Sequence, residues 1–213
     1  MRYQQIFWDF DGTLVDTYPG MVAAFHQALV ACRVNDFEID DDDVYRTMRQ
    51  HSLGTALQRF SAEYQLDQDR LAKIYQRKVA PMLSSAQPFK GAATILASIV
   101  AAGGRNFLLT HRDAQALNRL DELNLKQYFT GFVTASDNYP RKPDPTSLQA
   151  LCRQFDADPQ LALMVGDRTL DVTAGHRAGM AGALFDLDHL IVADSQPEFR
   201  TAELAELQAW LLA

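Results

Sequence analysis

The sequence predicts an α/β protein with a parallel sheet and an inserted helical domain, and three observations support this prediction. First, short apolar runs alternate with longer stretches of helical period, which is the pattern of repeated strand–helix units around a parallel sheet. Second, the stretch from residue 15 to residue 87 carries helical periodicity only, and it is far longer than an ordinary connection between strands. Third, a chain of 213 residues suffices for one large core that carries a smaller insertion.

Five short apolar runs are the strand candidates. Their length suits strands better than helices, and turn-forming or polar residues bound them. They span residues 5–8, 106–109, 132–135, 161–165 and 182–185.

Four stretches between and after these runs carry apolar residues at helical spacing, so we predict amphipathic helices there. Asp113 stands just before the second of them and is the predicted N-cap. The apolar positions are Ile95, Leu96, Ile99 and Val100; Leu117, Leu120 and Leu123; Leu148, Leu151, Cys152 and Phe155; and Leu204, Leu207, Trp210 and Leu211.

The long insertion is predicted to be a helical domain of residues 15–87, and residues 1–14 and 88–213 are predicted to form the core domain. The acidic run from Asp40 to Asp43 is interpreted as a solvated helix start that the helix dipole favours. Two apolar stripes carry the helical signal: Met21, Val22, Phe25, Ala28, Leu29 and Cys32, followed by Leu53, Leu57, Phe60 and Tyr64.

Composition excludes several classes of protein. The net charge of -7, with no block of lysines and arginines, argues against a general nucleic-acid binder, whose affinity comes from neutralising phosphates. Cys32 and Cys152 lie far apart in helix-like patterns, so we expect thiols in a reducing compartment and no disulfide. No signal peptide or membrane span is recognisable, and we expect a cytoplasmic protein without a membrane partner.

Polar residues follow four of the predicted strands at the point where each strand ends. Asp9 and Asp11 follow the first strand, Thr110 ends the second, Lys142 lies beyond the third, and Asp167 follows the fourth. In open parallel sheets, ligands bind at the carboxyl ends of the strands. We therefore expect these side chains to meet at one edge of the sheet.

Their chemistry is that of a phosphoryl-binding site. Carboxylates such as Asp9, Asp11 and Asp167 suit Mg²⁺, a cation that prefers a few carboxylates, waters and phosphate oxygens. Lys142 adds a compact positive charge and Thr110 a hydroxyl donor. Together they could neutralise and orient a phosphoryl group while a carboxylate attacks phosphorus.

The order of these motifs is distinctive. The chain carries DxDGT at residues 9–13, a strand that ends in Thr110, Lys142 in a KPDP context, and GDxxxD ending at Asp171. This order resembles the haloacid dehalogenase-like (HAD) superfamily, and the helical insertion resembles its C1 cap subclass, in the branch of phosphoglycolate phosphatase and β-phosphoglucomutase. The resemblance implies a Rossmann-like three-layer core with sheet order 5-4-1-2-3 and an α-helical cap with hinges near residues 15–17 and 87–91.

The resemblance also implies roles for the motif residues in a Mg²⁺-dependent phosphatase. Asp9 would be the nucleophile that forms an aspartyl-phosphate, and Asp11 the general acid and base, with its backbone carbonyl on the metal. Thr110 and Lys142 would hold the phosphoryl group. Asp9, Asp11 and Asp167 would surround Mg²⁺, and Asp171 would support that site indirectly, with direct ligation as the lesser alternative.

Other candidate residues carry weaker signals. His111 and Arg112 follow the threonine and are candidates for substrate contact, with a solvated loop as the open alternative. Within the insertion, residues 46–54 resemble the specificity loop of the family, and there Arg49 and His51 are candidates for contact with the leaving group. Asp186 and Asp188, after the last predicted strand, are interpreted as ordinary loop acids.

The alternatives differ in how well they explain the motifs. An EF-hand loop requires Gly and Glu where this chain has Leu14 and Gly20. A β-phosphoglucomutase-like mutase would carry a histidine where Met21 stands, and a dehalogenase does not need Asp11. A phosphonatase would use a cap lysine to form an imine with its substrate, and neither Lys73 nor Lys78 has a sequence context that suggests this role. The preferred prediction is a phosphatase for a small phosphorylated metabolite, with a mutase or a catalytically silent binding protein as alternatives. The substrate and the choice between monomer and dimer stay open.

Overall fold

The computed structural model describes residues 1–192 and 194–213. The chain divides into two compact units, one of residues 1–15 and 88–213 and the other of residues 16–87. The larger unit contains a parallel sheet, whereas the elements of the smaller unit are all helical. That the smaller unit acts as a cap stays a prediction.

The sheet of the larger unit is six-stranded, parallel throughout, and ordered β3-β2-β1-β4-β5-β6. Read from β5, the five predicted strands follow the predicted order 5-4-1-2-3, and β6 extends the sheet beyond β5. The sequence does not reveal β6, because it is three residues long and one of them is an exposed arginine. The strands are β1 (Gln5–Trp8), β2 (Arg105–Leu109), β3 (Phe129–Val133), β4 (Ala162–Gly166), β5 (Ala181–Phe185) and β6 (Phe199–Thr201).

Strand β3 begins three residues before the predicted start, because its first half lacks a continuous apolar run. Thr130 is exposed, and Gly131 is buried against the Phe155 ring, where an added Cβ would lie 2.4 Å from a ring carbon. The strand ends at Val133 because Thr134 caps a 3-10 turn, η3 (Ala135–Asp137), with its side chain.

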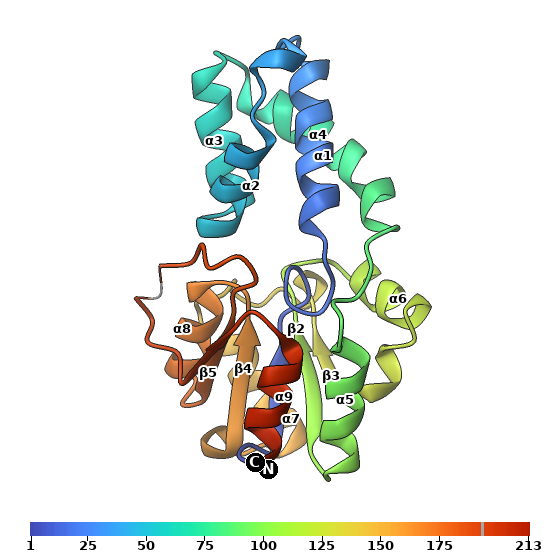
Figure 1. Cartoon of the computed structure of the whole chain (residues 1–213), viewed down its shortest axis with the longest axis vertical. Coiled ribbons are helices and arrows are strands. Elements are labelled where there is room, and N and C mark those ends of the chain that lie inside the picture. Colours follow the sequence, from blue (N-terminus) through green and yellow to red (C-terminus); the bar gives the residue numbers. More distant parts are fainter. Residues whose placement is uncertain (193) are drawn as a thin grey trace. The chain divides into compact units, whose positions relative to one another are not determined.

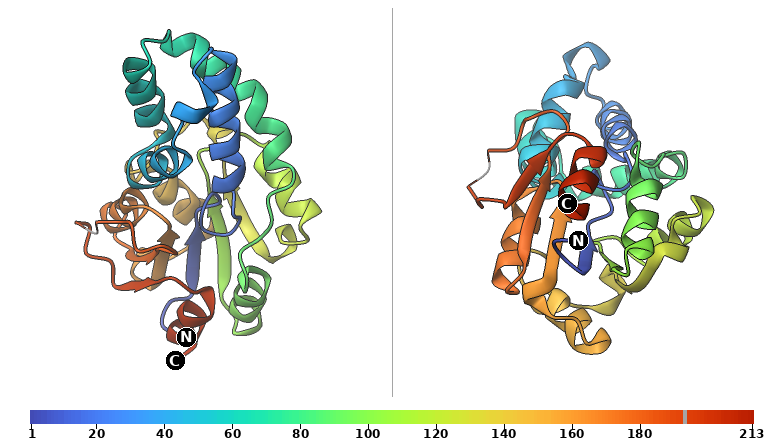
Figure 2. Two further views of the ribbon diagram at one scale, coloured as in Figure 1. Left: turned by 45° about the horizontal axis from the view of Figure 1, so that its top comes forward. Right: turned by 60° about the horizontal axis from the view of Figure 1, so that its bottom comes forward.

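Helices cover both faces of the sheet and make three layers (Figure 1). On one face, α7 (Thr146–Phe155) and α8 (Thr169–Arg177) contribute to a core with Phe7, Phe107 and Met164. On the other face lie α5 (Ala92–Ala101) and α9 (Leu204–Leu212), which run beside each other in the right-hand view of Figure 2. The predicted three-layer α/β core is confirmed.

A buried asparagine ties β1 and β2 to the elements that cover them. Asn106 is fully buried; its Oδ1 accepts a hydrogen bond from the Trp8 indole at 3.0 Å, and its Nδ2 donates to the carbonyls of Leu96 and Tyr128, both at 3.1 Å. Every polar atom of this side chain therefore has a partner, as a buried amide requires.

Shorter elements complete the larger unit: α6 (Gln115–Glu122), η2 (Lys126–Tyr128) and η4 (Pro159–Leu161). Helix α6 starts one residue later than a cap at Asp113 implies, because Ala114 is the N-cap residue. Asp113 still accepts a hydrogen bond from the backbone N–H of Gln115 at 3.0 Å, so it serves the first turn of the helix.

The smaller unit contains α1 (Tyr18–Ala31), η1 (Asp36–Glu38), α2 (Asp41–Gln50), α3 (Leu53–Glu63) and α4 (Gln68–Leu83). Helices α1 and α4 lie side by side (Figure 1), and Phe25 of α1 packs edge-on against Phe60 and Tyr75. Asp40 caps α2 by accepting hydrogen bonds from two backbone N–H groups, so the acidic run is the predicted helix start.

A histidine connects the first helix of the smaller unit to two acidic residues. His26 contacts Asp41 through Nδ1 and Asp36 through Nε2, both at 2.8 Å, and these hydrogen bonds raise the pKa of His26 above its ordinary value. The protonated imidazolium can donate to both carboxylates at once. The triad therefore ties α1 to η1 and to the start of α2.

Two further observations concern the state of the cysteines and the length of the helices. Cys152 is buried, Cys32 is half-buried, and both are free thiols. Within residues 1–192 and 194–213, no helix is both long enough and apolar enough to span a membrane.

The prediction for Asp186 as an ordinary loop acid is wrong. Its side chain is fully buried, accepts a hydrogen bond from the backbone N–H of Ile191 and forms an ion pair with Arg200 of β6. Since β6 was not predicted, the sequence could not reveal this arginine as a partner. Asp186 instead fixes the loop that joins β5 to the edge strand.

Candidate active site

The first motif forms a tight turn directly after β1. The backbone N–H of Asp9 still donates to Val165 in the ladder with β4, but Phe10 accepts hydrogen bonds from Leu14 and Val15, which closes the chain on itself. Gly12 has a φ of 70°, a left-handed conformation that glycine adopts without strain. Asp9 and Asp11 therefore do not lie on one continuing strand.

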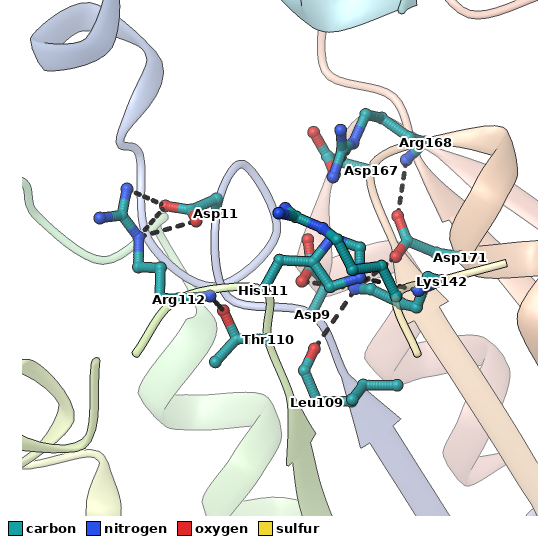
Figure 3. Close-up of polar contacts among 11 residues, drawn as sticks. Asp9, Asp11, Leu109, Thr110, His111, Arg112, Lys142, Asp167, Arg168 and Asp171 are labelled. Atoms are coloured by element: carbon teal, nitrogen blue, oxygen red, sulfur yellow. Dashed lines mark hydrogen bonds and ion pairs between the residues drawn. The ribbon is translucent and has the colours of Figure 1, made fainter. Parts of the chain in front are cut away.

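A buried lysine connects two of the carboxylates. The Nζ atom of Lys142 lies 2.7 Å from Oδ1 of Asp9 and 2.6 Å from Oδ1 of Asp171, and it donates to the carbonyl of Leu109 at 3.3 Å (Figure 3). All three ionic side chains are at least 96% buried, since their relative exposures are 0%, 4% and 0%. Three residues far apart in the sequence thus meet at the carboxyl ends of β1 and β4.

Asp167 adds a third carboxylate to this cluster. Asp9, Asp167 and Asp171 can each offer a carboxylate oxygen within 4.8 Å of the others. Asp171 comes this close because Gly166 has no side chain; an added Cβ would lie 2.2 Å from Cγ of Asp171. The glycine of the GDxxxD motif is therefore required for packing beside the acidic cluster.

The charges in this cluster perturb one another. Burial raises the pKa of Asp9 to about 7 although Lys142 opposes the shift, and the nearby Asp171 and Asp167 act in the same direction as burial. Burial alone would lower the pKa of Lys142, but Asp171 and Asp9 raise it above its ordinary value. For Asp171, the positive charges of Lys142 and Arg168 outweigh burial and lower the pKa. Of the two carboxylates that pair with Lys142, Asp9 is therefore the one whose charge is less stabilised.

The donor set fits a hard divalent cation. Oδ2 of Asp9 is buried and has no hydrogen-bond partner in the described part of the chain, so one oxygen is available for a ligand. Three carboxylates gather here, with Lys142 paired to two of them and Arg168 3.7 Å from the third, and a divalent cation would add positive charge to the cluster. Oxygen ligands of this kind suit Mg²⁺ and similar metals.

Both carboxylate oxygens of Asp171 have partners in the protein. Its Oδ1 pairs with Lys142, and its Oδ2 accepts a hydrogen bond from the backbone N–H of Arg168 at 3.1 Å. That Asp171 supports the metal site indirectly stays a prediction.

Asp11 is paired with Arg112. Nε of Arg112 lies 2.7 Å from both oxygens of Asp11, and a second guanidinium nitrogen lies 2.7 Å from Oδ1 (Figure 3). Sequence reasoning treated Arg112 only as a candidate for substrate contact. Asp11 and Arg112 are 101 positions apart in the sequence, so no local pattern indicates that they form a pair.

Thr110 and His111 stand between Arg112 and Lys142. The Thr110 side chain is buried, and its Oγ1 accepts a hydrogen bond from the backbone N–H of Arg112 at 3.1 Å. Nε2 of His111 accepts from the backbone N–H of Lys142 at 2.8 Å. Burial, together with Lys142 and Arg141, lowers the pKa of His111 to about 3, so the ring is neutral and positions the backbone at Lys142.

The two candidates of the insertion lie in the smaller unit. Arg49 is in the last turn of α2 and is buried, with its guanidinium carbon 5.5 Å from the centroid of the Tyr18 ring. His51 is the exposed C-cap residue of α2. The stretch 46–54 is mostly the end of α2 and the start of α3, joined by a connection of two residues, and not an extended loop.

The fold and the site define a class of protein: an open parallel α/β sheet with a buried acidic cluster at the carboxyl ends of its strands. The family model of the haloacid dehalogenase-like hydrolases matches residues 6–185 of this chain. The chain therefore belongs to the haloacid dehalogenase-like hydrolase family, as its motifs predicted.

Individual relatives agree with this assignment. A phosphoglycolate phosphatase of Rhodospirillum rubrum is 29% identical over 186 residues, which cover 82% of this chain and 76% of the relative. The pyrophosphatase PpaX of Bacillus cereus is 26% identical over 192 residues, 84% of this chain and 81% of the relative. A crystal structure of a predicted phosphoglycolate phosphatase from Haemophilus somnus has a TM-score of 0.83 at 19% identity and covers 99% of both chains.

Proposed function

We propose that the protein is a Mg²⁺-dependent phosphatase that hydrolyses a small phosphate ester through an aspartyl-phosphate on Asp9. One observation carries the proposal: Asp9 is buried at the carboxyl edge of the sheet, with one oxygen paired to Lys142 and the other without a partner in the described residues. A carboxylate in this position can act as a nucleophile toward phosphorus.

In the proposed reaction, the Asp9 carboxylate attacks phosphorus and the ester oxygen leaves. Lys142 and the Thr110 hydroxyl bind the phosphoryl oxygens and stabilise the charge that develops on them. The divalent cation, held by Asp9, Asp167 and the Asp11 carbonyl, would supply further neutralisation of that charge. Water then hydrolyses the aspartyl-phosphate and restores the Asp9 carboxylate.

Asp11 is proposed as the acid that protonates the leaving oxygen and as the base that later activates water. Its present partner, the Arg112 guanidinium, occupies both carboxylate oxygens. Proton transfer therefore requires Asp11 to release at least one of these contacts when substrate binds. Arg112 becomes available to the substrate in the same movement.

The smaller helical unit, residues 16–87, is proposed as the cap that selects the leaving group, with Arg49 and His51 as candidate contacts. The names of the relatives support phosphoglycolate and pyrophosphate as first substrates to test. A cytoplasmic location is proposed with them, since the free thiols suit a reducing compartment.

The test is phosphate release from p-nitrophenyl phosphate, phosphoglycolate, pyrophosphate and sugar phosphates, with and without Mg²⁺. Asp9→Asn should abolish turnover, whereas Asp121→Asn, an exposed acid on α6, should not change it. Turnover in Asp9→Asn equal to that of the unchanged protein would exclude the proposed nucleophile. Well-folded protein without activity on the whole panel would favour the binding role.

A further inference from the structure

A cavity of about 320 Å³ lies in the larger unit, beside the carboxyl ends of β2 and β3. This volume is at the lower end of the range for small-molecule pockets. None of the acidic cluster lines the cavity, and none of the described residues that line it is acidic. Its polar lining consists of Thr110, His111, Thr134, Asn138, Tyr139, Arg141 and Ser147, and Thr110 is also a candidate for holding the phosphoryl group.

Ser147 provides the first sign that this cavity takes a ligand. The residue is 1% exposed, and its Oγ has no hydrogen-bond partner in the described part of the chain. A buried hydroxyl without a partner costs free energy, and such groups are rare in native proteins. Because Ser147 lines the cavity, a molecule bound there could accept the missing hydrogen bond.

Arg141 provides the second sign. It is exposed, and no carboxylate lies within 4.0 Å of its charged group among residues 1–192 and 194–213; its one recorded polar contact is Nε to Nδ1 of His111 at 3.3 Å. The ring of His111 is neutral, so it does not compensate the charge of the guanidinium. The cavity therefore carries an unpaired positive charge in a protein whose net charge is -7.

The remaining lining decides the class of ligand. Val133 is buried, and Tyr139 presents a half-exposed ring at the cavity. The hydroxyl of Thr134 is already bonded to Asp137 at 3.0 Å. A ligand with one anionic group and a small apolar body matches this distribution of charge and apolar surface.

We propose that this cavity is a binding site for a small monocarboxylate, beside the phosphoryl site and sharing Thr110 with it. The guanidinium of Arg141 binds the carboxylate, the Ser147 hydroxyl donates to one of its oxygens, and the apolar body packs against Val133 and Tyr139. The proposal does not depend on phosphatase activity, because none of these four residues belongs to the acidic cluster.

The position of the site connects it to Lys142. His111 contacts Arg141 through Nδ1 and holds the backbone of Lys142 through Nε2. A carboxylate that draws Arg141 away from His111 frees the ring to reorient. Occupancy should therefore also perturb the backbone amide of Lys142.

The test uses benzoate as the probe and benzamide as its uncharged counterpart. ¹⁵N-labelled protein is titrated with each at constant ionic strength, and amide chemical shifts are followed. For a ligand of this size we expect a dissociation constant on the order of 1 mM for benzoate. The amides of Asn138, Tyr139 and Lys142 should move, and benzamide should bind at least about tenfold more weakly.

Three variants separate the contributions. Arg141→Gln should weaken benzoate binding at least about tenfold and Ser147→Ala at least about threefold. Arg153→Gln, another exposed arginine that does not line the cavity, should bind benzoate like the unchanged protein. Equal affinity in Arg141→Gln and Arg153→Gln, equal affinity for benzamide, or an absence of shifts at these amides would overturn the proposal.

Stability without ligand provides an independent check. If the Ser147 hydroxyl is reserved for a ligand, Ser147→Ala removes an unsatisfied group and should leave the melting temperature unchanged or raise it. A lower melting temperature would mean that the hydroxyl has a structural partner, and this result would overturn its assignment as a ligand donor.

Discussion

A divalent cation should stabilise the metal-free protein, and it should do so more strongly at neutral than at acidic pH. The acidic cluster gives the reason, because Asp9, Asp167 and Asp171 bring carboxylate oxygens within 4.8 Å of one another. At an effective dielectric constant of about 20, two unit charges at this separation repel by about 3 kcal/mol. Lys142 and Arg168 offset part of that repulsion, and a cation would offset more of it.

The size of the effect follows from the binding equilibrium. At a concentration one hundred times the dissociation constant, a ligand that binds only the folded state stabilises it by about 2.7 kcal/mol. For a protein of 213 residues this corresponds to a rise in melting temperature of about 5 to 10 °C. The increase should depend on cation concentration and approach this range as the site is saturated.

Protons compete with the cation at Asp9. The folded protein without metal raises the pKa of Asp9 from 3.8 to about 7, so between these values the folded state binds more protons than the unfolded chain. Its stability therefore falls as the pH rises through this window, and the ionised carboxylate is available to the cation only toward the upper end. The cation should raise the melting temperature less at about pH 5.5 than at about pH 7.5.

The assay is differential scanning calorimetry of chelator-treated protein with increasing MgCl₂, at an ionic strength held constant with NaCl. Asp167→Asn should lose most of the increase, and Asp121→Asn, an exposed acid, should keep it. The reasoning is refuted if Asp167→Asn retains the full increase, or if NaCl alone reproduces it. An increase that is larger at acidic pH would contradict the proton competition at Asp9.

The remaining predictions concern the fold and the motif glycine. His26→Ala should cost about 0.5 kcal/mol at acidic pH, since the imidazolium is partly exposed and screened by solvent. Because the pKa of His26 is raised above 6.5, this cost should disappear as the pH rises through the folded-state pKa, in urea unfolding at two pH values. Asn106→Leu should cost about 2 to 4 kcal/mol in the same experiment, since the Trp8 indole and two carbonyls lose their partner. Gly166→Ala should displace Asp171 and lower kcat more than about tenfold in the p-nitrophenyl phosphate assay.

Each of these predictions has a matched control. Gln27→Ala, on the same helix as His26, should show no pH-dependent cost, and an equal cost at both pH values for His26→Ala would contradict the ionic triad. Asn118→Leu, on α6, should change stability far less than the substitution at Asn106. Gly54→Ala is the control for Gly166→Ala, because a Cβ added at Gly54 would make only ordinary van der Waals contacts. Full activity in Gly166→Ala would show that Asp171 can move without affecting catalysis.

The sequence predicted the parts of this protein that local patterns specify. Strand β1 was predicted with its observed bounds because the apolar run of Ile6, Phe7 and Trp8 ends at the first carboxylate. The order of the five main strands came from the resemblance to the family, whereas the position of Asp9, Thr110, Lys142 and Asp167 beyond the strand ends was predicted from the apolar runs that precede them. A polar edge strand such as β6 carries no comparable signal.

The pairings within the site could not be predicted, because they depend on side-chain packing between distant segments. From its position after Thr110, Arg112 was only a candidate for substrate contact, and its pairing with Asp11 became visible in the structure alone. His111 likewise followed the threonine in the sequence, but its ring accepts the backbone N–H of Lys142. A motif therefore locates the chemical groups, whereas the shape of the surrounding chain determines which group meets which.

The position of Trp8 directly before Asp9, where its indole is held by Asn106, makes this residue a fluorescent reporter of the site. The chain has two tryptophans, and Trp8 is fully buried one peptide bond from Asp9, whereas Trp210 is half-buried on α9, stacked on Phe199 with ring centroids 4.6 Å apart. In Trp210→Phe, all indole fluorescence would come from Trp8. Such a variant would report cation and phosphate binding at Asp9 through its emission, without a label and without turnover.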